Sequence, residues 1–321
     1  MNQAPHRDLH VAEPRSLGER LAVVIPCLNE ETTVAQVVTD FARELPDAQI
    51  YVFDNGSTDR TAEVARQAGA TVVFSPRRGK GNVIRHMANA VNADVYMLVD
   101  GDSTYPAAAA GELLRQFHAH GVDMLVATRL ESHDGEAFRL FHKLGNRLIA
   151  RIISALFSTS VSDVLSGYRV LSADFVRVLH VRSEKFEIEA ELTLQALAKG
   201  FTIREVPVAY GSRPAGSRSK LNTWSDGFLI LKCIALLFKD YKPFVFFTWV
   251  AALLALASLA SGSAPVIDFY RYGLVLHIPR AILAAGLGTL ATICFGVGLL
   301  LDSIARYHLE TVELLKRSLR R

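Results

Sequence analysis

The chain has 321 residues, half of which are hydrophobic, and a net charge of +3 at pH 7. The length suits one large domain or two modest ones, and so small a charge argues against a nucleic-acid partner. The three cysteines, Cys27, Cys233 and Cys294, are far apart in the sequence, which argues against a zinc site or a disulfide framework and fits a reducing compartment.

Residues 1–20 mix charged residues and prolines without an apolar core, so they predict a flexible arm and not a signal peptide. The chain then alternates between short apolar runs and helical patterns. The runs predict strands at residues 21–25, 49–53, 71–74, 95–99 and 124–127. Helices are predicted between them at about residues 31–44, 57–67 and 82–91. This order predicts an α/β fold with a mostly parallel sheet, whose right-handed crossovers place the loops after the strands at one edge.

Residues 138–157 combine cations and apolar residues at helical spacing. Such a helix can lie on an anionic membrane surface. The pattern taken alone favours an ordinary surface helix with a solvated basic face.

Two long apolar segments follow, and they predict transmembrane helices at about residues 243–261 and 280–301. Cations flank the pair on the side of the large domain and in the tail, so the positive-inside rule predicts that both are cytoplasmic. The predicted divisions are a flexible arm (1–20), a main domain (21–220), an interfacial amphipathic helix (221–242), the two-helix hairpin (243–302) and a basic tail (303–321). Small residues in the second helix permit a homo-oligomer; they are Gly286, Gly288, Gly296 and Gly298.

The motif Asp100-Gly101-Asp102 directly follows the predicted strand at 95–99. Open α/β sheets bind ligands at the carboxyl ends of their strands. Paired carboxylates suit Mg²⁺ or Mn²⁺, which bind through one or two carboxylates plus substrate phosphates, and a glycine between them suits close approach of a ligand to the backbone. The alternative is a solvated turn, because Asp and Gly are common turn residues.

Two further motifs end the first and second strands, Pro26-Cys27-Leu28-Asn29-Glu30 and Asp54-Asn55-Gly56-Ser57. With Asp100-Gly101-Asp102 they form an ordered set that resembles family 2 glycosyltransferases, whose fold is called GT-A. The segment Asp163-Val164-Leu165-Ser166-Gly167-Tyr168-Arg169 is similar to the polyprenyl-phosphate branch of that family, which includes dolichol-phosphate mannose and glucose synthases. The resemblance covers roughly residues 20–235, and the hairpin is similar to that of membrane-anchored bacterial members.

The resemblance implies roles for individual residues. Asp102 would be the principal ligand of a divalent metal, and Asp100 would contact the ribose or help to hold the metal. Residues at the donor nucleotide would be Pro26, Asn29, Glu30, Asp54 and Lys80. Glu191, from the pair Glu189 and Glu191, would lie near the donor and the metal. Cations that bind phosphates would be Arg129, Arg139, Arg213 and Lys220.

The implied reaction is transfer of a hexose from a nucleotide sugar to a polyprenyl phosphate at the membrane, with inversion at the anomeric carbon. Residues 100–106 lack the Gln of the Asp-Ala-Asp-Leu-Gln-His-Pro segment in well-studied mannose synthases, which puts a mannose donor in doubt. A UDP-hexose is therefore favoured and GDP-mannose is the alternative. A different lipid or glycan acceptor and an inactive membrane scaffold remain as rival functions.

Overall fold

The computed structural model describes residues 18–129, 149–151, 153–154, 157, 159–184, 187–211, 232, 235–236 and 238–319. It divides the chain into two compact units, Met1–Cys233 and Ile234–Arg321, called here the sheet unit and the hairpin unit. Most of the helix predicted at 138–157 and most of the interfacial helix predicted at 221–242 lie outside the described residues.

The sheet unit is built on a seven-stranded sheet in the order β3-β2-β1-β4-β6-β5-β7. The strands are β1 (Leu21–Cys27), β2 (Gln49–Asp54), β3 (Thr71–Phe74), β4 (Val95–Leu98), β5 (Met124–Arg129), β6 (Arg169–Ser172) and β7 (Ile203–Val208). All neighbouring pairs are parallel except those of β6, which runs antiparallel to both β4 and β5. The predicted α/β class and mostly parallel sheet are confirmed, and the insertion of β6 between β4 and β5 was not predicted.

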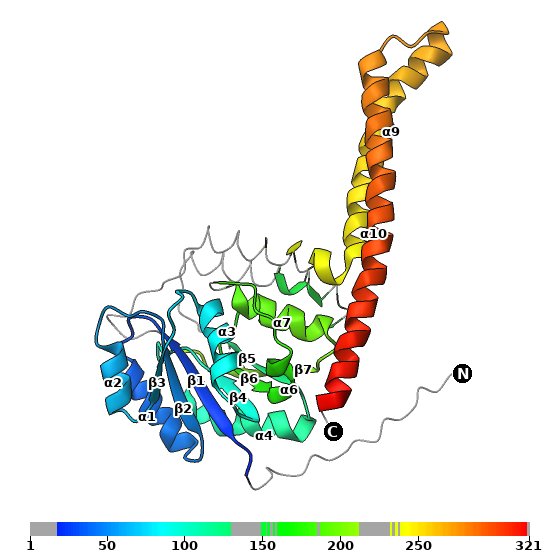
Figure 1. The fold of residues 1–321 in the computed structure, drawn as a ribbon. Helices are drawn as coiled ribbons and strands as arrows, with labels where there is room; N and C mark the ends of the chain where they lie inside the picture. Colours follow the sequence, from blue (N-terminus) through cyan, green and yellow to red (C-terminus); the bar gives the residue numbers. More distant parts are fainter. Residues whose placement is uncertain are drawn as a thin grey trace. The chain divides into compact units, whose positions relative to one another are not determined.

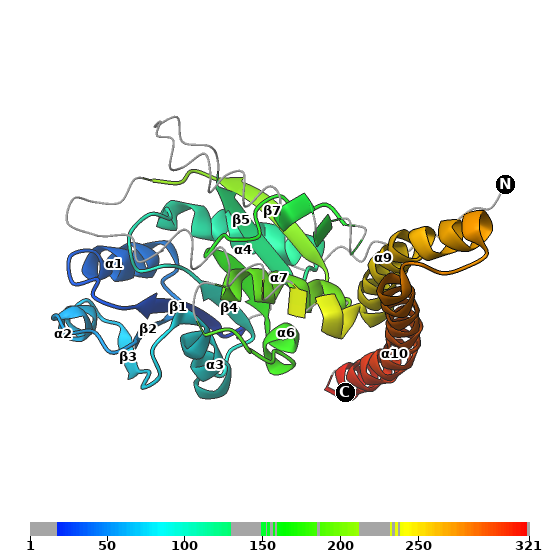
Figure 2. The same ribbon diagram turned by 90° about the horizontal axis from the view of Figure 1, so that it is seen from above.

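Helices cover both faces of this sheet (Figures 1 and 2). One face packs against α1 (Val34–Glu44), α2 (Thr61–Gln67) and α4 (Ala110–His120), and the other against α3 (Lys80–Ala90), α6 (Ala173–Arg177) and α7 (Ile188–Ala198). In β1 the side chains alternate between the two cores: Val23 and Ile25 join the first, and Ala22 and Val24 join the second. A strand that is buried on both sides needs apolar residues at every position, which explains the unbroken apolar runs.

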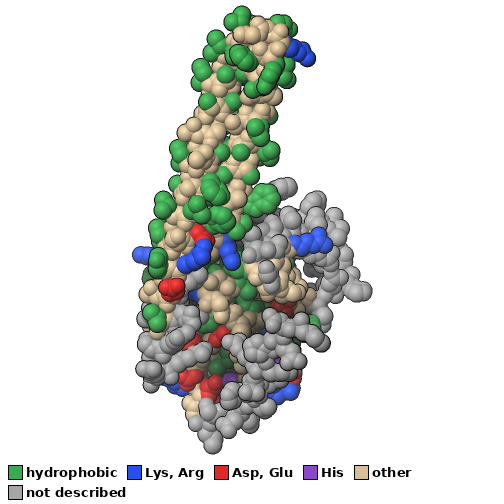
Figure 3. Space-filling model, turned by 90° about the vertical axis from the view of Figure 1, so that its right-hand side faces the viewer, with side chains coloured by type: hydrophobic (Ala, Val, Ile, Leu, Met, Phe, Trp, Pro, Cys, Tyr) green, Lys and Arg blue, Asp and Glu red, His purple; other side chains and the backbone are tan. Residues whose placement is uncertain are grey.

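The hairpin unit consists of α9 (Pro243–Tyr272) and α10 (Ile278–Leu319). Pro243–Tyr272 and Ile278–Tyr307 are each long and apolar enough to cross a membrane. Hydrophobic side chains cover the visible face of the hairpin in Figure 3. Both helices extend beyond the predicted spans of 243–261 and 280–301, and α10 continues as one helix through most of the predicted tail.

Contacts between small residues hold α9 and α10 together. The Ser258 hydroxyl donates to the Ala284 carbonyl at 2.7 Å, and a Cβ added at Gly298 would lie 2.8 Å from the Cβ of Phe247. A Cβ at Gly286 or Gly296 would have no atom of the described residues within 4 Å. Those two glycines therefore leave open surface on α10, and the homo-oligomer stays a prediction.

Candidate functional site

The three motif loops meet at one edge of the sheet because β2, β1 and β4 are adjacent and parallel. Cys27 at the end of β1 is in register with Asp54 at the end of β2. The Asn55 backbone N–H donates to the Cys27 carbonyl at 2.9 Å, so pairing continues into the loops. The predicted convergence of the three loops is the arrangement found.

Asn29 joins the first loop to the second. Its side-chain oxygen accepts from the Thr58 N–H at 2.8 Å, and its own N–H donates to the Ser57 hydroxyl at 2.9 Å. Its φ of 53° is left-handed, a conformation that Asn tolerates better than most residues. The structure thus gives Asn29 a role in fixing loop geometry, while Asp54 is buried and accepts from the Ser57 N–H at 3.0 Å.

Thr33 joins the first loop to the acidic loop. Its hydroxyl donates to the Gly101 carbonyl at 2.7 Å and lies 3.5 Å from a carboxylate oxygen of Glu30. Glu30 is buried, and its N–H donates to the Thr61 hydroxyl at 2.8 Å. Hydrogen bonds therefore connect the first loop to the second loop and to the acidic loop.

The two aspartates of the acidic loop have different environments. Asp102 is only 4% exposed, and one of its oxygens accepts from the Thr104 N–H at 3.2 Å and the Thr104 hydroxyl at 2.5 Å. Asp100 is the more accessible, with 30% of its side chain exposed. Ser103, between Asp102 and Thr104, has a left-handed φ of 60°. Strained backbone of this kind concentrates at functional sites.

Gly101 packs closely against the end of β1. A Cβ at this position would lie 2.5 Å from the sulfur of Cys27. The glycine therefore lets the acidic loop pack against the end of β1, and the close approach of a ligand to this backbone stays a prediction.

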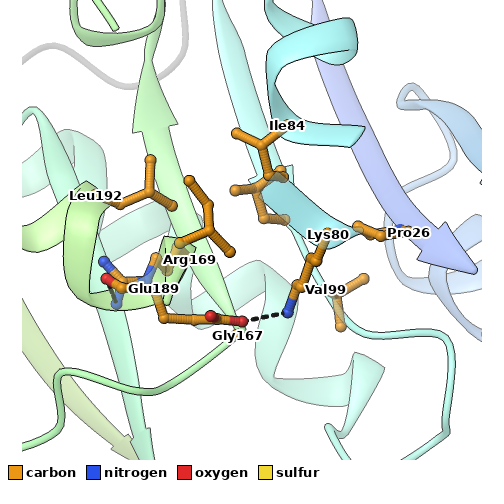
Figure 4. Close-up of a pocket in the computed structure, with 10 residues that line it drawn as sticks. Pro26, Lys80, Ile84, Val99, Gly167, Arg169, Glu189 and Leu192 are labelled. Atoms are coloured by element: carbon orange, nitrogen blue, oxygen red, sulfur yellow. Dashed lines mark hydrogen bonds and ion pairs between the residues drawn. The ribbon is translucent and has the colours of Figure 1, made fainter. Parts of the chain in front are cut away.

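Lys80, the first residue of α3, lies between two carboxylates. Its ammonium group forms ion pairs with Asp100 and, at 2.6 Å, with Glu189. Figure 4 shows Lys80 and Glu189. Burial alone would lower the pKa of Lys80, but the two carboxylates outweigh it and raise that pKa, so the group is positively charged. Burial raises the pKa of Glu189, an effect that Lys80 opposes.

The prediction that Glu191 faces the donor and the metal is wrong in its placement. Glu191 is fully buried, and its carboxylate accepts from the N–H groups of Arg182 and Ser183 and from the Gln195 side chain at 2.7–3.1 Å. Glu189, two residues earlier in α7, is the one that reaches Lys80. Residues two apart on a helix point about 200° apart, so only one of the pair can face the acidic loop.

Arg129, at the end of β5, is held by Asp163. Its Nε and Nη2 groups donate to the two carboxylate oxygens of Asp163, each at 2.8 Å, and its guanidinium lies 5.6 Å from the centre of the Tyr210 ring. Burial lowers the pKa of Arg129, but the pairing with Asp163 outweighs burial and raises it. Its Nη1 group donates to none of the described residues.

Arg169 ends the 163–169 motif and is buried, and the sequence predicted no role of its own for it. Its N–H groups donate to the carbonyls of Ser166, Val164 and Glu189, to the Thr193 hydroxyl at 2.9 Å and to the Met124 sulfur at 3.3 Å. These five acceptors match the five N–H donors of a guanidinium. Arg169 thereby joins the 163–169 segment to the turn of α7 that carries Glu189.

The remaining predicted site residues fall in two groups. Pro26 lies at the same edge as Lys80 and Glu189 and lines a small pocket with them. Arg139, Arg213 and Lys220 lie outside the described residues.

The described residues contain no group of three or more His, Cys, Asp or Glu side chains placed to hold a metal ion. A divalent metal at this edge would therefore need Asp100 and Asp102 together with oxygens from a substrate. That donor set fits Mg²⁺ or Mn²⁺, which commonly combine one or two carboxylates with substrate phosphates.

Comparisons with known proteins agree with this architecture. Residues 22–179 match the model of glycosyl transferase family 2. Glycosyltransferase AglJ of Haloferax volcanii is 30% identical over 301 residues, which cover 92% of this chain and 97% of that protein. A dolichyl-phosphate hexose transferase of the same organism is 29% identical over 214 residues, which cover 67% of this chain and 92% of that protein.

A solved structure shares the fold. Glucosyl-3-phosphoglycerate synthase from Mycobacterium tuberculosis, in complex with Mn²⁺ and UDP-glucose, has a TM-score of 0.56 and 22% identity, and the match covers 69% of this chain and 79% of that one.

Proposed function

Because the chain belongs to glycosyl transferase family 2 and is a transferase, we propose that it moves a hexose from a nucleotide sugar to a polyprenyl phosphate, with inversion at the anomeric carbon. One observation carries the proposal: the edge that bears Asp100 and Asp102 and the two apolar helices of the hairpin unit belong to the same chain. A lipid-linked acceptor explains why both occur together.

The donor in this proposal is a UDP-hexose, with GDP-mannose as the alternative. A protein that shares the fold binds UDP-glucose and Mn²⁺, and the buried Asp54 and Glu30 lie on the loops where the resemblance puts the base and the ribose. Asp100 and Asp102 would hold Mg²⁺ or Mn²⁺. When bound, such a cation supplies stabilisation of the negative charge on the departing nucleoside diphosphate.

The acceptor needs little activation. A phosphate monoester has a second pKa of about 6 and is mostly dianionic at pH 7, so no strong general base is required. The protein's task is to hold two anions close together. Arg129 serves this task in our proposal because Asp163 fixes its guanidinium through Nε and Nη2, and its positive charge offsets the repulsion between the two anions.

The two apolar helices support a lipid-linked acceptor. The two apolar helices could span a membrane, and the dolichyl-phosphate hexose transferase of Haloferax volcanii acts on a lipid phosphate by its name. We propose that the sheet unit and the C-terminal end of α10 lie on the cytoplasmic side, since cations flank the hairpin there.

The test uses the full-length protein in lipid nanodiscs with UDP-glucose, Mn²⁺ and undecaprenyl phosphate. We expect Asp102→Asn to lower turnover by about 10²–10³-fold, in the range of lost electrostatic stabilisation at a reacting centre. Asp40→Asn, at a partly exposed ion pair with Arg43 in α1, is the matched control and is expected to leave turnover unchanged. Undiminished turnover by Asp102→Asn would refute the role of the acidic loop.

The same assay separates the rival functions. Faster transfer to a diacylglycerol or a glycan than to undecaprenyl phosphate would replace the acceptor and keep the family. Absence of any Mg²⁺-dependent thermal stabilisation by UDP or GDP sugars would favour an inactive scaffold.

A further inference from the structure

The ammonium group of Lys80 is shared by two carboxylates that come from different elements. Asp100 follows β4, whereas Glu189 lies in the first turn of α7. The side chain of Lys80 is 13% exposed and that of Glu189 is 7% exposed, so the pair is shielded from water. One cation therefore holds together two anions that would otherwise repel each other.

Glu189 has an unused oxygen. Its Oε1 accepts from Lys80 at 2.6 Å, but its Oε2 is buried and has no hydrogen-bond partner among the described residues. A buried carboxylate oxygen without a partner is costly and rare in folded proteins. Glu189 can therefore accept a further N–H from Lys80 without losing any existing hydrogen bond.

Gly167 confines the ion pair on one side. A Cβ at this position would collide with Oδ2 of Asp100 and approach the Lys80 nitrogen to 3.0 Å. The backbone of the 163–169 segment thus packs directly on the two charged groups. Lys80 consequently has two carboxylate positions to occupy, Asp100 and Glu189, and little other space.

A divalent cation on Asp100 would change this arrangement. The cation and the ammonium group are both positive and would compete for the same carboxylate, since like charges at short range repel strongly where water is excluded. We propose that Glu189 is a positioning residue that takes over Lys80 when a divalent cation binds Asp100. The inference rests on the proposed function, because it assumes that Asp100 is a metal ligand.

The proposal makes two opposite predictions for metal affinity without nucleotide. Lys80→Met removes the competing cation and should tighten Mn²⁺ binding by about 3- to 30-fold, the range expected for one nearby, partly screened charge. Glu189→Gln removes the alternative partner, leaves Lys80 on Asp100 and should weaken Mn²⁺ binding by a similar factor. The double variant should match Lys80→Met, because Glu189 acts only through Lys80.

The experiment titrates the full-length protein with Mn²⁺ and measures free Mn²⁺ by electron paramagnetic resonance. Glu187→Gln, which removes a carboxylate just before the same helix, is the control for long-range charge and should leave affinity unchanged. Thermal melting confirms folding of each variant, and Lys80→Gln replaces Lys80→Met if the latter does not fold.

Two results would overturn the inference. Unchanged affinity in Lys80→Met means that lysine and metal do not compete. Equal weakening by Glu189→Gln with and without Lys80 means that Glu189 acts on the metal directly. If one of these results is found and the wild type still transfers hexose with Mn²⁺, the inference fails and the proposed function stands. If the wild type neither transfers hexose nor binds Mn²⁺ in the presence of UDP-glucose, the inference and the proposed function both fail.

Discussion

The sheet unit and the hairpin unit differ in how much apolar side-chain surface they expose. In the described part of the sheet unit, Phe74 is the one large hydrophobic side chain that is mostly exposed, whereas α9 and α10 expose many, including Leu253, Leu256 and Leu259. Only 6% and 11% of the most apolar windows of the two helices are buried. A continuous exposed apolar surface of this kind marks contact with lipid or a partner. The first unit therefore buries its apolar side chains, whereas the second has two helices that could span a membrane.

Polar groups differ in the same way. The sheet unit connects its loops through side-chain hydrogen bonds, as at Asn29, Thr33 and Arg169. In the hairpin unit the backbone bonds are satisfied within each helix, as a spanning segment requires, and Ser258 makes one of the few polar contacts between helices. Removal of a side-chain hydrogen bond should therefore destabilise the sheet unit, and a charge placed on the exposed apolar surface should disturb the hairpin unit.

The largest expected effect is in the sheet unit, at Arg169. Arg169→Met removes five N–H donors and leaves buried acceptors without partners, so we expect a loss of about 3–5 kcal/mol in the free energy of unfolding. Chemical denaturation followed by the fluorescence of a site-specific label in the sheet unit measures this loss. Arg177→Met, at a partly exposed ion pair of α6, should change stability by about 0.5 kcal/mol or less. Equal effects of the two substitutions would contradict the assignment of Arg169 as a structural centre.

A charge on the hairpin surface tests the other half of the comparison. Leu256, near the middle of α9, is 64% exposed, and Phe74 of the sheet unit is 61% exposed. If the first faces lipid and the second faces water, Leu256→Arg should cost about 3 kcal/mol in membrane insertion, while Phe74→Arg should change unfolding by about 0.5 kcal/mol or less. A glycosylation-based insertion assay measures the first value, and denaturation measures the second. If Leu256→Arg leaves insertion unchanged, this contradicts the placement of α9 in the bilayer.

Most of the sheet could be predicted because its strands are buried on both faces. Unbroken apolar runs such as Val95–Leu98 leave few alternatives, and parallel strands put their following loops at one edge. β6 was not predicted, because its place and direction in the sheet depend on its partners β4 and β5, which are distant in sequence.

The site was predicted less completely than the fold. α7 is buried all round, with no apolar stripe to orient it, so the sequence could not distinguish Glu189 from Glu191. Gly101 permits close packing against Cys27, a contact between two loops that no local pattern encodes. Loop identities follow from motifs, whereas the choice of side chain within a loop depends on tertiary packing.

The smallest predicted effect compares one hydrogen bond in each unit. Thr33→Val keeps the side-chain shape but removes the bond to Gly101, so we expect a loss of about 1 kcal/mol in the sheet unit. Ser258→Ala removes the bond to Ala284, and interhelical hydrogen bonds in membranes average about 0.6 kcal/mol. Thr33→Val should also raise the KM for the nucleotide sugar, because Gly101 carries the backbone between Asp100 and Asp102, whereas Ser258→Ala should not. Denaturation and donor titration of both variants in the same nanodiscs provide the measurement. If Ser258→Ala shifts the donor KM and Thr33→Val does not, the expected difference between the two units is wrong.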